Sequence, residues 1–116
     1  MNKYEDLKIW KKAMDLVEAV YLLMKQLPEE EKFGLISQIK RSSVSIPSNI
    51  AEGAGRNSKK EFVHFLSVSN GSTTELETQL ILVYRLNFAD RNKIEPLLDK
   101  CAEIKKMNYA LQKSIT

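Results

Sequence analysis

Apolar residues recur at three- and four-residue intervals in four stretches of the chain, which is the spacing of one face of an α-helix. No stretch shows the strict apolar and polar alternation that is typical of a β-strand. The four stretches cover residues 3–27, about 29–53, about 59–86 and about 91 onward. Because the connectors between them are short, consecutive helices should pack antiparallel. The pattern predicts one all-α domain, residues 1–116, folded as an antiparallel up-and-down four-helix bundle.

Two helix starts are marked by a capping box, in which an N-cap side chain and a Glu three residues later each bond the other's backbone N–H. Asn2 with Glu5 has this pattern before the first stretch, and Ser58 with Glu61 has it before the third. We therefore expect the first helix to begin near Lys3 and the third directly after Ser58.

Proline, glycine and acidic residues mark the other helix ends. Pro28 ends the first helix, and the acidic run 29–31 favours a helix start there, because a helix N-terminus carries partial positive charge. Gly53 and Gly55 are expected to end the second helix in a short loop. Pro96 is tolerated in a first helical turn, so the fourth helix should begin shortly before it.

The first stretch carries two adjacent apolar seams at heptad spacing. One seam is Leu7, Trp10, Met14, Val17, Tyr21 and Met24, and the other is Ile9, Ala13, Leu16, Val20, Leu23 and Leu27. So wide an apolar face is more than one neighbouring helix covers. Two explanations remain open: the helix is buried between two others of the same subunit, or one seam is a subunit interface.

The second stretch carries a seam of hydrogen-bonding side chains beside its apolar stripe. The polar seam consists of Gln38, Ser42, Ser45, Asn49 and Glu52. A solvated face would be richer in Lys and Glu, so we interpret the seam as a polar network or an interface. Pro47 removes one backbone hydrogen bond, at a cost of about 3 kcal/mol, and predicts a kink there. Ser42 and Ser43 can bond the freed backbone, which is an equally good structural explanation of these serines.

The third stretch has a matching polar stripe of Ser72, Glu75 and Gln79. This stripe can face the polar seam of the second stretch, with Arg41 within reach of Glu75. Gly71 costs about 1 kcal/mol relative to Ala inside a helix, so its presence predicts the close approach of another helix.

Residues for catalysis and metal binding are few. The single histidine, His64, has no cysteine or carboxylate cluster with which to form a zinc site or a catalytic triad. The glycines at 53 and 55 lack the Lys-Ser/Thr and the preceding strand of a phosphate loop. Cys101 belongs to an apolar stripe and is interpreted as a small buried hydrophobe. We therefore expect no catalytic residues, no metal and no cofactor; an enzyme using Glu52 or Glu75 as an acid–base group is the remaining hypothesis of that class.

The net charge of +3 permits binding to a polyanion without requiring it. Basic residues gather around the second helix and the loop after it, and these candidate phosphate contacts are Lys40, Arg41, Arg56, Lys59 and Lys60. A solvated surface of mixed charge explains the same residues in a single subunit.

The lone cysteine and the absence of an 18-residue apolar run predict a cytoplasmic protein with no membrane-spanning segment.

Motifs distributed over nearly the whole chain resemble those of the small helical proteins encoded by intervening sequences of large-subunit ribosomal RNA genes. The most specific is Ser45-Ile46-Pro47-Ser48-Asn49-Ile50-Ala51-Glu52-Gly53. The others are Asp6-Leu7 with Trp10, Phe33-Gly34-Leu35, Gln38-Ile39 with Arg41, Glu61-Phe62 with Phe65-Leu66, Gly71-Ser72 and Glu75-Leu76-Glu77.

This resemblance implies an up-and-down bundle that assembles into a homopentamer, in a family labelled as ribosomal-protein-like and without established enzymatic activity. Accessory proteins of diversity-generating retroelements are similar in fold, and they bind nucleic acid and a reverse transcriptase. The sequence and the resemblance together lead to the hypothesis of a non-catalytic homo-oligomer that binds RNA or DNA without reading its sequence. The alternative is a scaffold that binds another protein and no nucleic acid.

Overall fold

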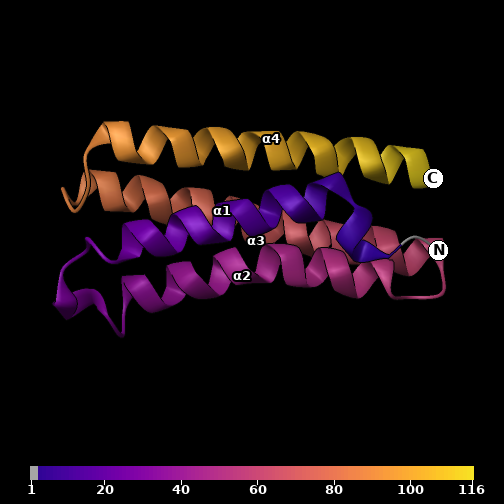
Figure 1. The fold of residues 1–116 in the computed structure, drawn as a ribbon, viewed down its shortest axis with the longest axis horizontal. Helices are drawn as coiled ribbons and strands as arrows, with labels where there is room; N and C mark the ends of the chain where they lie inside the picture. Colours follow the sequence, from indigo (N-terminus) through magenta and orange to yellow (C-terminus); the bar gives the residue numbers. More distant parts are fainter. Residues whose placement is uncertain (1–2) are drawn as a thin grey trace.

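The structure is a computed structural model that describes residues 3–116, and its four α-helices confirm the predicted all-α bundle. The helices are α1 (Lys8–Met24), α2 (Leu35–Ala54), α3 (Lys59–Arg85) and α4 (Arg91–Ile115). Figure 1 shows them running up and down along the long axis of a molecule measuring 43 × 24 × 19 Å. The start of α1, the α2–α3 turn and the end of α4 consequently lie at the same end of the bundle.

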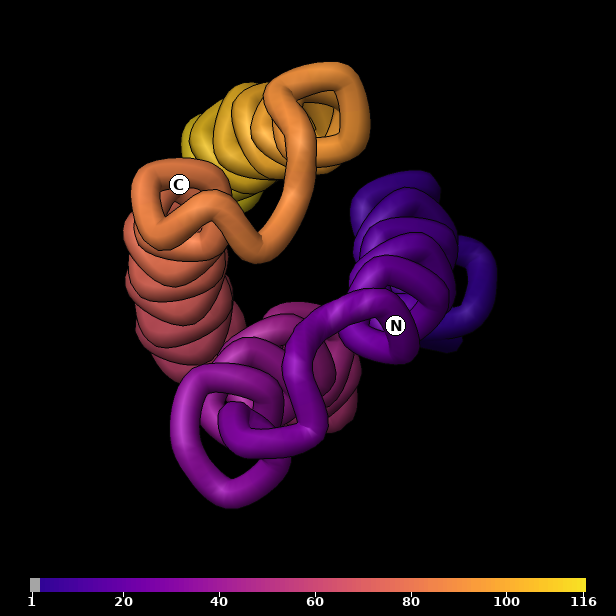
Figure 2. Tube along the Cα trace, turned by 90° about the vertical axis from the view of Figure 1, so that its left-hand side faces the viewer, coloured from indigo at the N-terminus to yellow at the C-terminus, as the bar shows by residue number. Residues whose placement is uncertain are grey.

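The helices follow one another around the bundle in chain order, and α1 closes the ring against α4 (Figure 2). The most extensive contact is between α2 and α3. Each helix turns an apolar stripe inward, and the fully buried side chains include Leu16, Val20, Ile39, Ile46, Ile50, Leu66, Leu76, Leu80, Val83 and Ile104. Burial of such stripes is what the four-stretch pattern predicts.

Two helices begin later than the sequence predicts. The first begins at Lys8 and not near Lys3, because Leu7 is extended and separates it from a short 3₁₀ turn, Tyr4–Asp6. The second begins at Leu35 and not at Glu29, since residues Glu29–Glu31 form another 3₁₀ turn. The expected cap residue Asn2 lies outside the described residues.

The other two starts agree with the sequence. The Ser58 hydroxyl accepts a hydrogen bond from the Glu61 backbone N–H at 3.1 Å, which is the N-cap half of a capping box, and it donates to Glu61 Oε2 at 3.1 Å. Helix α4 begins at Arg91. Helix α3 ends at Arg85, and Asn87, two residues further on, has a left-handed φ of 62°. The N–H groups of Asn87 and Phe88 bond back to the carbonyls of Tyr84 and Val83, which closes the helix in a Schellman motif.

Neither Pro47 nor Gly53 interrupts α2. The helix is continuous across Pro47, so the chain does not break there. It also continues through Gly53, against the expectation that this glycine ends it, and reaches Gly55 with a φ of −82°. Gly53 is needed for contact instead: a Cβ at this position would lie 2.8 Å from Phe65 Cβ of α3. The absence of a side chain is therefore what lets α2 and α3 approach so closely.

Candidate functional site

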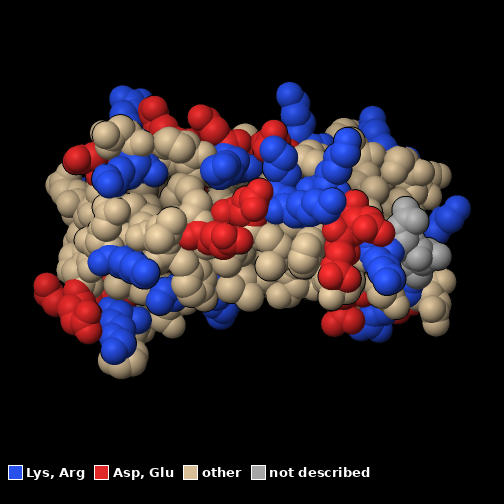
Figure 3. Space-filling model, in the orientation of Figure 1, with Lys and Arg blue, Asp and Glu red and all other residues tan. Residues whose placement is uncertain are grey.

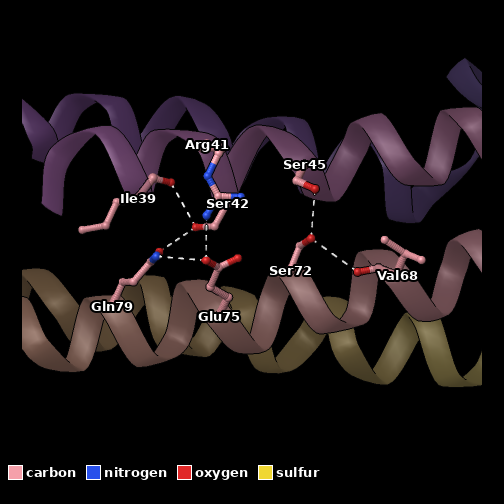
Figure 4. A network of polar contacts seen from close by, with 8 residues as sticks. All are labelled: Ile39, Arg41, Ser42, Ser45, Val68, Ser72, Glu75 and Gln79. Atoms are coloured by element: carbon pink, nitrogen blue, oxygen red, sulfur yellow. Dashed lines mark hydrogen bonds and ion pairs between the residues drawn. The ribbon is translucent and has the colours of Figure 1, made fainter. Parts of the chain in front are cut away.

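The polar seam of α2 faces the polar stripe of α3 within one subunit (Figure 4). The buried Ser42 hydroxyl donates to Gln79 Oε1 at 2.7 Å, and Gln79 Nε2 donates to Glu75 Oε2 at 3.4 Å. Arg41 Nη2 donates to the same Glu75 oxygen at 2.9 Å, as the sequence predicts. The described residues leave no buried side-chain nitrogen or oxygen without a partner. The seam is therefore a satisfied network that sets the register of α2 against α3.

The rest of the seam makes one further contact between α2 and α3, and its other members bond within α2 or face solvent. The hydroxyls of Ser45 and Ser72 share a hydrogen bond of 2.9 Å between the two helices, and Asn49 Nδ2 donates back to the carbonyl and hydroxyl of Ser45. Glu52 is exposed and pairs with Arg56 at 3.3 Å. Gln38 is exposed as well. The predicted set therefore includes the residues that join α2 to α3, together with Asn49, which bonds only within α2, and Gln38 and Glu52, which lie at the surface.

The serines next to Pro47 do not bond the carbonyl that the proline frees, which is that of Ser43. The Ser42 hydroxyl donates to the Ile39 carbonyl at 3.2 Å, and the Ser43 hydroxyl donates to the Lys40 carbonyl at 2.9 Å. Both bonds run one turn backwards along α2, which is the usual local bond of a serine inside a helix. Ser42 consequently acts in the α2–α3 network.

The two apolar seams of α1 have different surroundings. The seam from Ile9 to Leu27 is buried against the rest of the bundle. In the other seam Trp10 and Val17 are half-buried, and Met14 and Tyr21 remain 37% and 39% exposed. The bundle itself therefore covers one seam completely and leaves the middle of the second partly open.

The open seam forms one wall of an apolar groove, and α2 forms the other. Two hollows share Val17 and Val44 and so join into one groove; we call it the α1/α2 groove. Its lining comprises Trp10, Met14, Val17, Tyr21 and Leu22 from α1 and Val44, Pro47 and Ala51 from α2, with Tyr4 at one end and Glu18, Lys25 and Ser48 at the rim. Lys40 lies beside it, with Nζ 5.0 Å from the centre of the Tyr21 ring. Sequence reasoning missed the α2 wall, although Val44, an apolar residue beside the polar seam, was a signal for it.

The predicted basic cluster is divided between two places. Lys40 and Arg41 lie in the first half of α2, whereas Arg56, Lys59 and Lys60 lie at the α2–α3 turn, roughly 20 Å away at 1.5 Å per helical residue. Both arginines are engaged by carboxylates, Arg41 by Glu75 and Arg56 by Glu52 and Glu61.

The positive charges of the lysines in the α2–α3 turn have fewer nearby carboxylates than those of the arginines. Within residues 3–116, no carboxylate lies within ion-pair distance of Lys59 or Lys60. Both border shallow pockets next to the C-terminal residues Ile115 and Thr116. On the face in Figure 3, blue and red side chains are mixed over the upper part and at both ends, and an uncharged stretch remains in the lower middle.

Other reactive side chains are engaged in the fold. Burial and the nearby Glu77 carboxylate raise the pKa of the Cys101 thiol from 9.0 to about 12, so Cys101 is a neutral core residue at physiological pH. Across residues 3–116, no three His, Cys, Asp or Glu side chains gather closely enough to hold a metal ion. None of the helices described has the length and apolar character needed to cross a bilayer.

Comparisons with known proteins agree on a family. The model of the family described as 23S rRNA-intervening sequence protein matches residues 5–110. A crystal structure from Bacteroides thetaiotaomicron, described as a protein with unknown function from the S23 ribosomal protein family, superposes with a TM-score of 0.84. It is 27% identical in sequence, and the match covers 90% of this chain and 98% of that one. A search of functionally curated proteins gives no match.

Proposed function

The chain belongs to the 23S rRNA-intervening sequence protein family, and we propose that it is a cytoplasmic, non-catalytic homo-oligomer whose subunits associate through the α1/α2 groove. The observation that carries this proposal is the half-open second seam of α1. Exposed apolar residues are common singly, but a continuous groove of them is typical of an interaction site. The polar seam, which could have served as an interface instead, is already paired inside the subunit.

Burial of the groove supplies a driving force for association. Each Å² of apolar surface removed from water contributes about 25 cal/mol. Met14, Tyr21 and Val44 each keep more than a third of their surface exposed, at 37%, 39% and 40%. A charge introduced among these three side chains would have to leave water in an assembled oligomer, which is costly even where Lys40 can pair with it, whereas in a lone subunit it would stay in water.

Light scattering during size-exclusion chromatography tests this proposal. We expect the wild-type protein to elute as one species heavier than the 13.3 kDa subunit, and the family resemblance implies five subunits. Val44→Glu should elute as a folded monomer, because it places a carboxylate inside the groove. Tyr109→Glu is the matched control, since Tyr109 is 64% exposed on α4, and it should keep the wild-type mass.

A wild-type mass of 13.3 kDa at micromolar concentration would refute self-association. A single protein retained from lysate after nuclease treatment, and lost with Val44→Glu, would then support the alternative of a scaffold for another protein. An oligomer unaffected by Val44→Glu would show that the subunits meet elsewhere.

Non-specific binding of RNA or DNA is the second candidate function, and the lysines of the α2–α3 turn favour it. Lys59 and Lys60 have no neutralising carboxylate among the described residues, and symmetric assembly repeats them in every subunit. Lysines in such an array contact phosphates and release condensed counterions.

Fluorescence anisotropy at low salt should therefore detect binding to structured RNA, with affinity that falls steeply as salt rises. Lys59→Gln combined with Lys60→Gln should weaken binding and reduce the salt dependence. The control Lys100→Gln with Lys106→Gln, on α4, removes the same charge elsewhere and should have the smaller effect. Absence of binding, or binding insensitive to salt, would exclude this function.

A further inference from the structure

Helix α3 carries an exposed row of residues at alternating spacings of three and four. The row consists of Val68, Gly71, Glu75, Thr78 and Leu82, and we call it the α3 stripe. Val68 and Leu82 are 40% and 41% exposed, although both are apolar. This is the heptad spacing by which one helix packs into a groove between others. Val68 and Leu82 lie outside the bundle core, whereas Glu75 also belongs to the α2–α3 network through Arg41.

Gly71, within this stripe, has no role in the described part of a single subunit. A Cβ at Gly71 would meet no heavy atom within 4 Å, the neighbouring turns of its own helix aside, in contrast to the crowded Gly53. A glycine inside a helix is less favourable than an alanine, and the described part of the monomer gains no packing in return. The sequence predicts close approach of another helix at Gly71, and no other helix of the described subunit comes close to it.

We propose that the α3 stripe of one copy of this chain occupies the α1/α2 groove of the next copy. This inference rests on the proposed self-association and names the surface that fills the groove. The two surfaces match in length: the groove spans roughly 17 Å along α1 from Trp10 to Tyr21, and the stripe roughly 21 Å from Val68 to Leu82, at 1.5 Å per residue. Gly71 lets the helices meet at close range.

The charges of the two surfaces are compatible with this contact. Glu75, at the centre of the stripe, is the stripe's one ionisable group; it pairs with Arg41 of its own subunit and keeps 41% of its side chain exposed, so its carboxylate stays accessible to a further cation. The groove has Lys25 and Glu18 at its rim and Lys40 over the Tyr21 ring. A symmetric contact between the grooves of two copies would instead bring the same lysines together. It would also leave the α3 stripe and Gly71 without a partner.

The contact is head-to-tail, because the groove and the stripe are different surfaces of one chain. Such a contact repeats from copy to copy until the chain of subunits closes into a ring. It also predicts complementation: a subunit whose stripe is disabled by mutation can still bind, through its intact groove, the stripe of a subunit whose groove is disabled.

Mixing two variants tests the inference. Val44→Glu disables the groove, and Val68→Glu disables the stripe. Each should elute alone as a 13.3 kDa monomer with wild-type circular dichroism, and an equimolar mixture should form a heterodimer of twice that mass. The heterodimer should grow no further, because its remaining groove and stripe are both disabled.

The outcomes separate this inference from the proposal beneath it. If Val68→Glu keeps the wild-type oligomer, the α3 stripe is not the surface that fills the groove, and the proposal that subunits associate through the groove still stands. A Val44→Glu protein that keeps it overturns the groove as the site of association. Two monomers that form no heterodimer overturn the head-to-tail contact.

Gly71→Leu is a second stripe variant that the monomer tolerates, because its Cβ enters open space. We expect it to prevent assembly of the otherwise wild-type chain and to raise the melting temperature of the monomeric Val44→Glu protein. Ala110→Leu, exposed on α4, adds similar bulk elsewhere and should leave the oligomer intact. Full assembly of Gly71→Leu would contradict the inference even if Val68→Glu failed to fold.

Discussion

Gly53→Ala should lower the free energy of unfolding by about 2 kcal/mol, although alanine is the better helix former. The added methyl group would lie 2.8 Å from Phe65 Cβ, 3.0 Å from Phe62 Cδ1 and 3.2 Å from the Phe62 carbonyl oxygen. The first and last of these atoms belong to the backbone region of α3, so a rotamer change cannot move them away. Helices α2 and α3 must separate instead, which also strains the Ser45–Ser72 and Ser42–Gln79 hydrogen bonds. Urea unfolding followed by circular dichroism measures the loss.

Gly55→Ala is the matched control, two residues further along the same helix. Its Cβ would meet the Ala51 and Glu52 carbonyl oxygens at 3.5 and 3.6 Å, which is ordinary contact, and its φ of −82° suits any residue. Alanine there restricts the unfolded chain, so we expect stability to stay the same or rise by about 0.5 kcal/mol. Equal effects of the two substitutions would show that Gly53 is not a contact residue.

Gly53 also shows where sequence reasoning reached its limit. Two glycines near the end of an apolar stretch are typical of a helix terminus, and the helix does end at the second of them. Whether a glycine ends a helix or lets a neighbour approach depends on what faces it, and that is set by Phe62 and Phe65 in another helix. The same pattern in the chain therefore fits both roles.

The polar seam was predictable because side chains that must pair are spaced alike on both helices. A seam on α2 and a stripe on α3 at three- and four-residue intervals imply contact, and the Arg41–Glu75 pair follows from it. Gln38 and Glu52 could not be separated from the buried members, since burial near a helix end depends on where the neighbouring helix begins and ends.

The groove was only half predictable for a related reason. Heptad spacing shows that α1 has more apolar surface than one helix covers, but not which seam the bundle covers. That choice depends on the rotation of α1 about its axis, which packing of all four helices decides. Val44 and Ala51 complete the groove from α2, and their contribution appears only when the two helices are placed side by side.

Asn108 shows how much a single buried amide contributes to the contact between α3 and α4. It is 1% exposed, and its Nδ2 donates to the Leu66 carbonyl at 2.8 Å while its Oδ1 accepts from Gln112 Nε2 at 2.6 Å. Asn108→Asp keeps the shape and replaces the donor by a carboxylate oxygen facing a carbonyl oxygen. We expect this change to lower the free energy of unfolding by about 3 kcal/mol at pH 7, because it buries a charge beside an acceptor.

The loss should depend on pH in a defined direction. Burial raises the folded-state pKa of the new carboxyl above its unfolded value of about 3.9, so the unfolded state loses its proton first and stability falls as pH rises through that range. Below it the protonated carboxyl can donate to Leu66 again, and the variant should approach the wild type measured at the same pH. Asn92→Asp makes the same chemical change in the exposed first turn of α4 and should be neutral or slightly stabilising. Urea unfolding of the three proteins at pH 7 and near pH 3.5 checks the sign, and a deficit that stayed constant with pH would mean that lost packing, and not the buried charge, causes it.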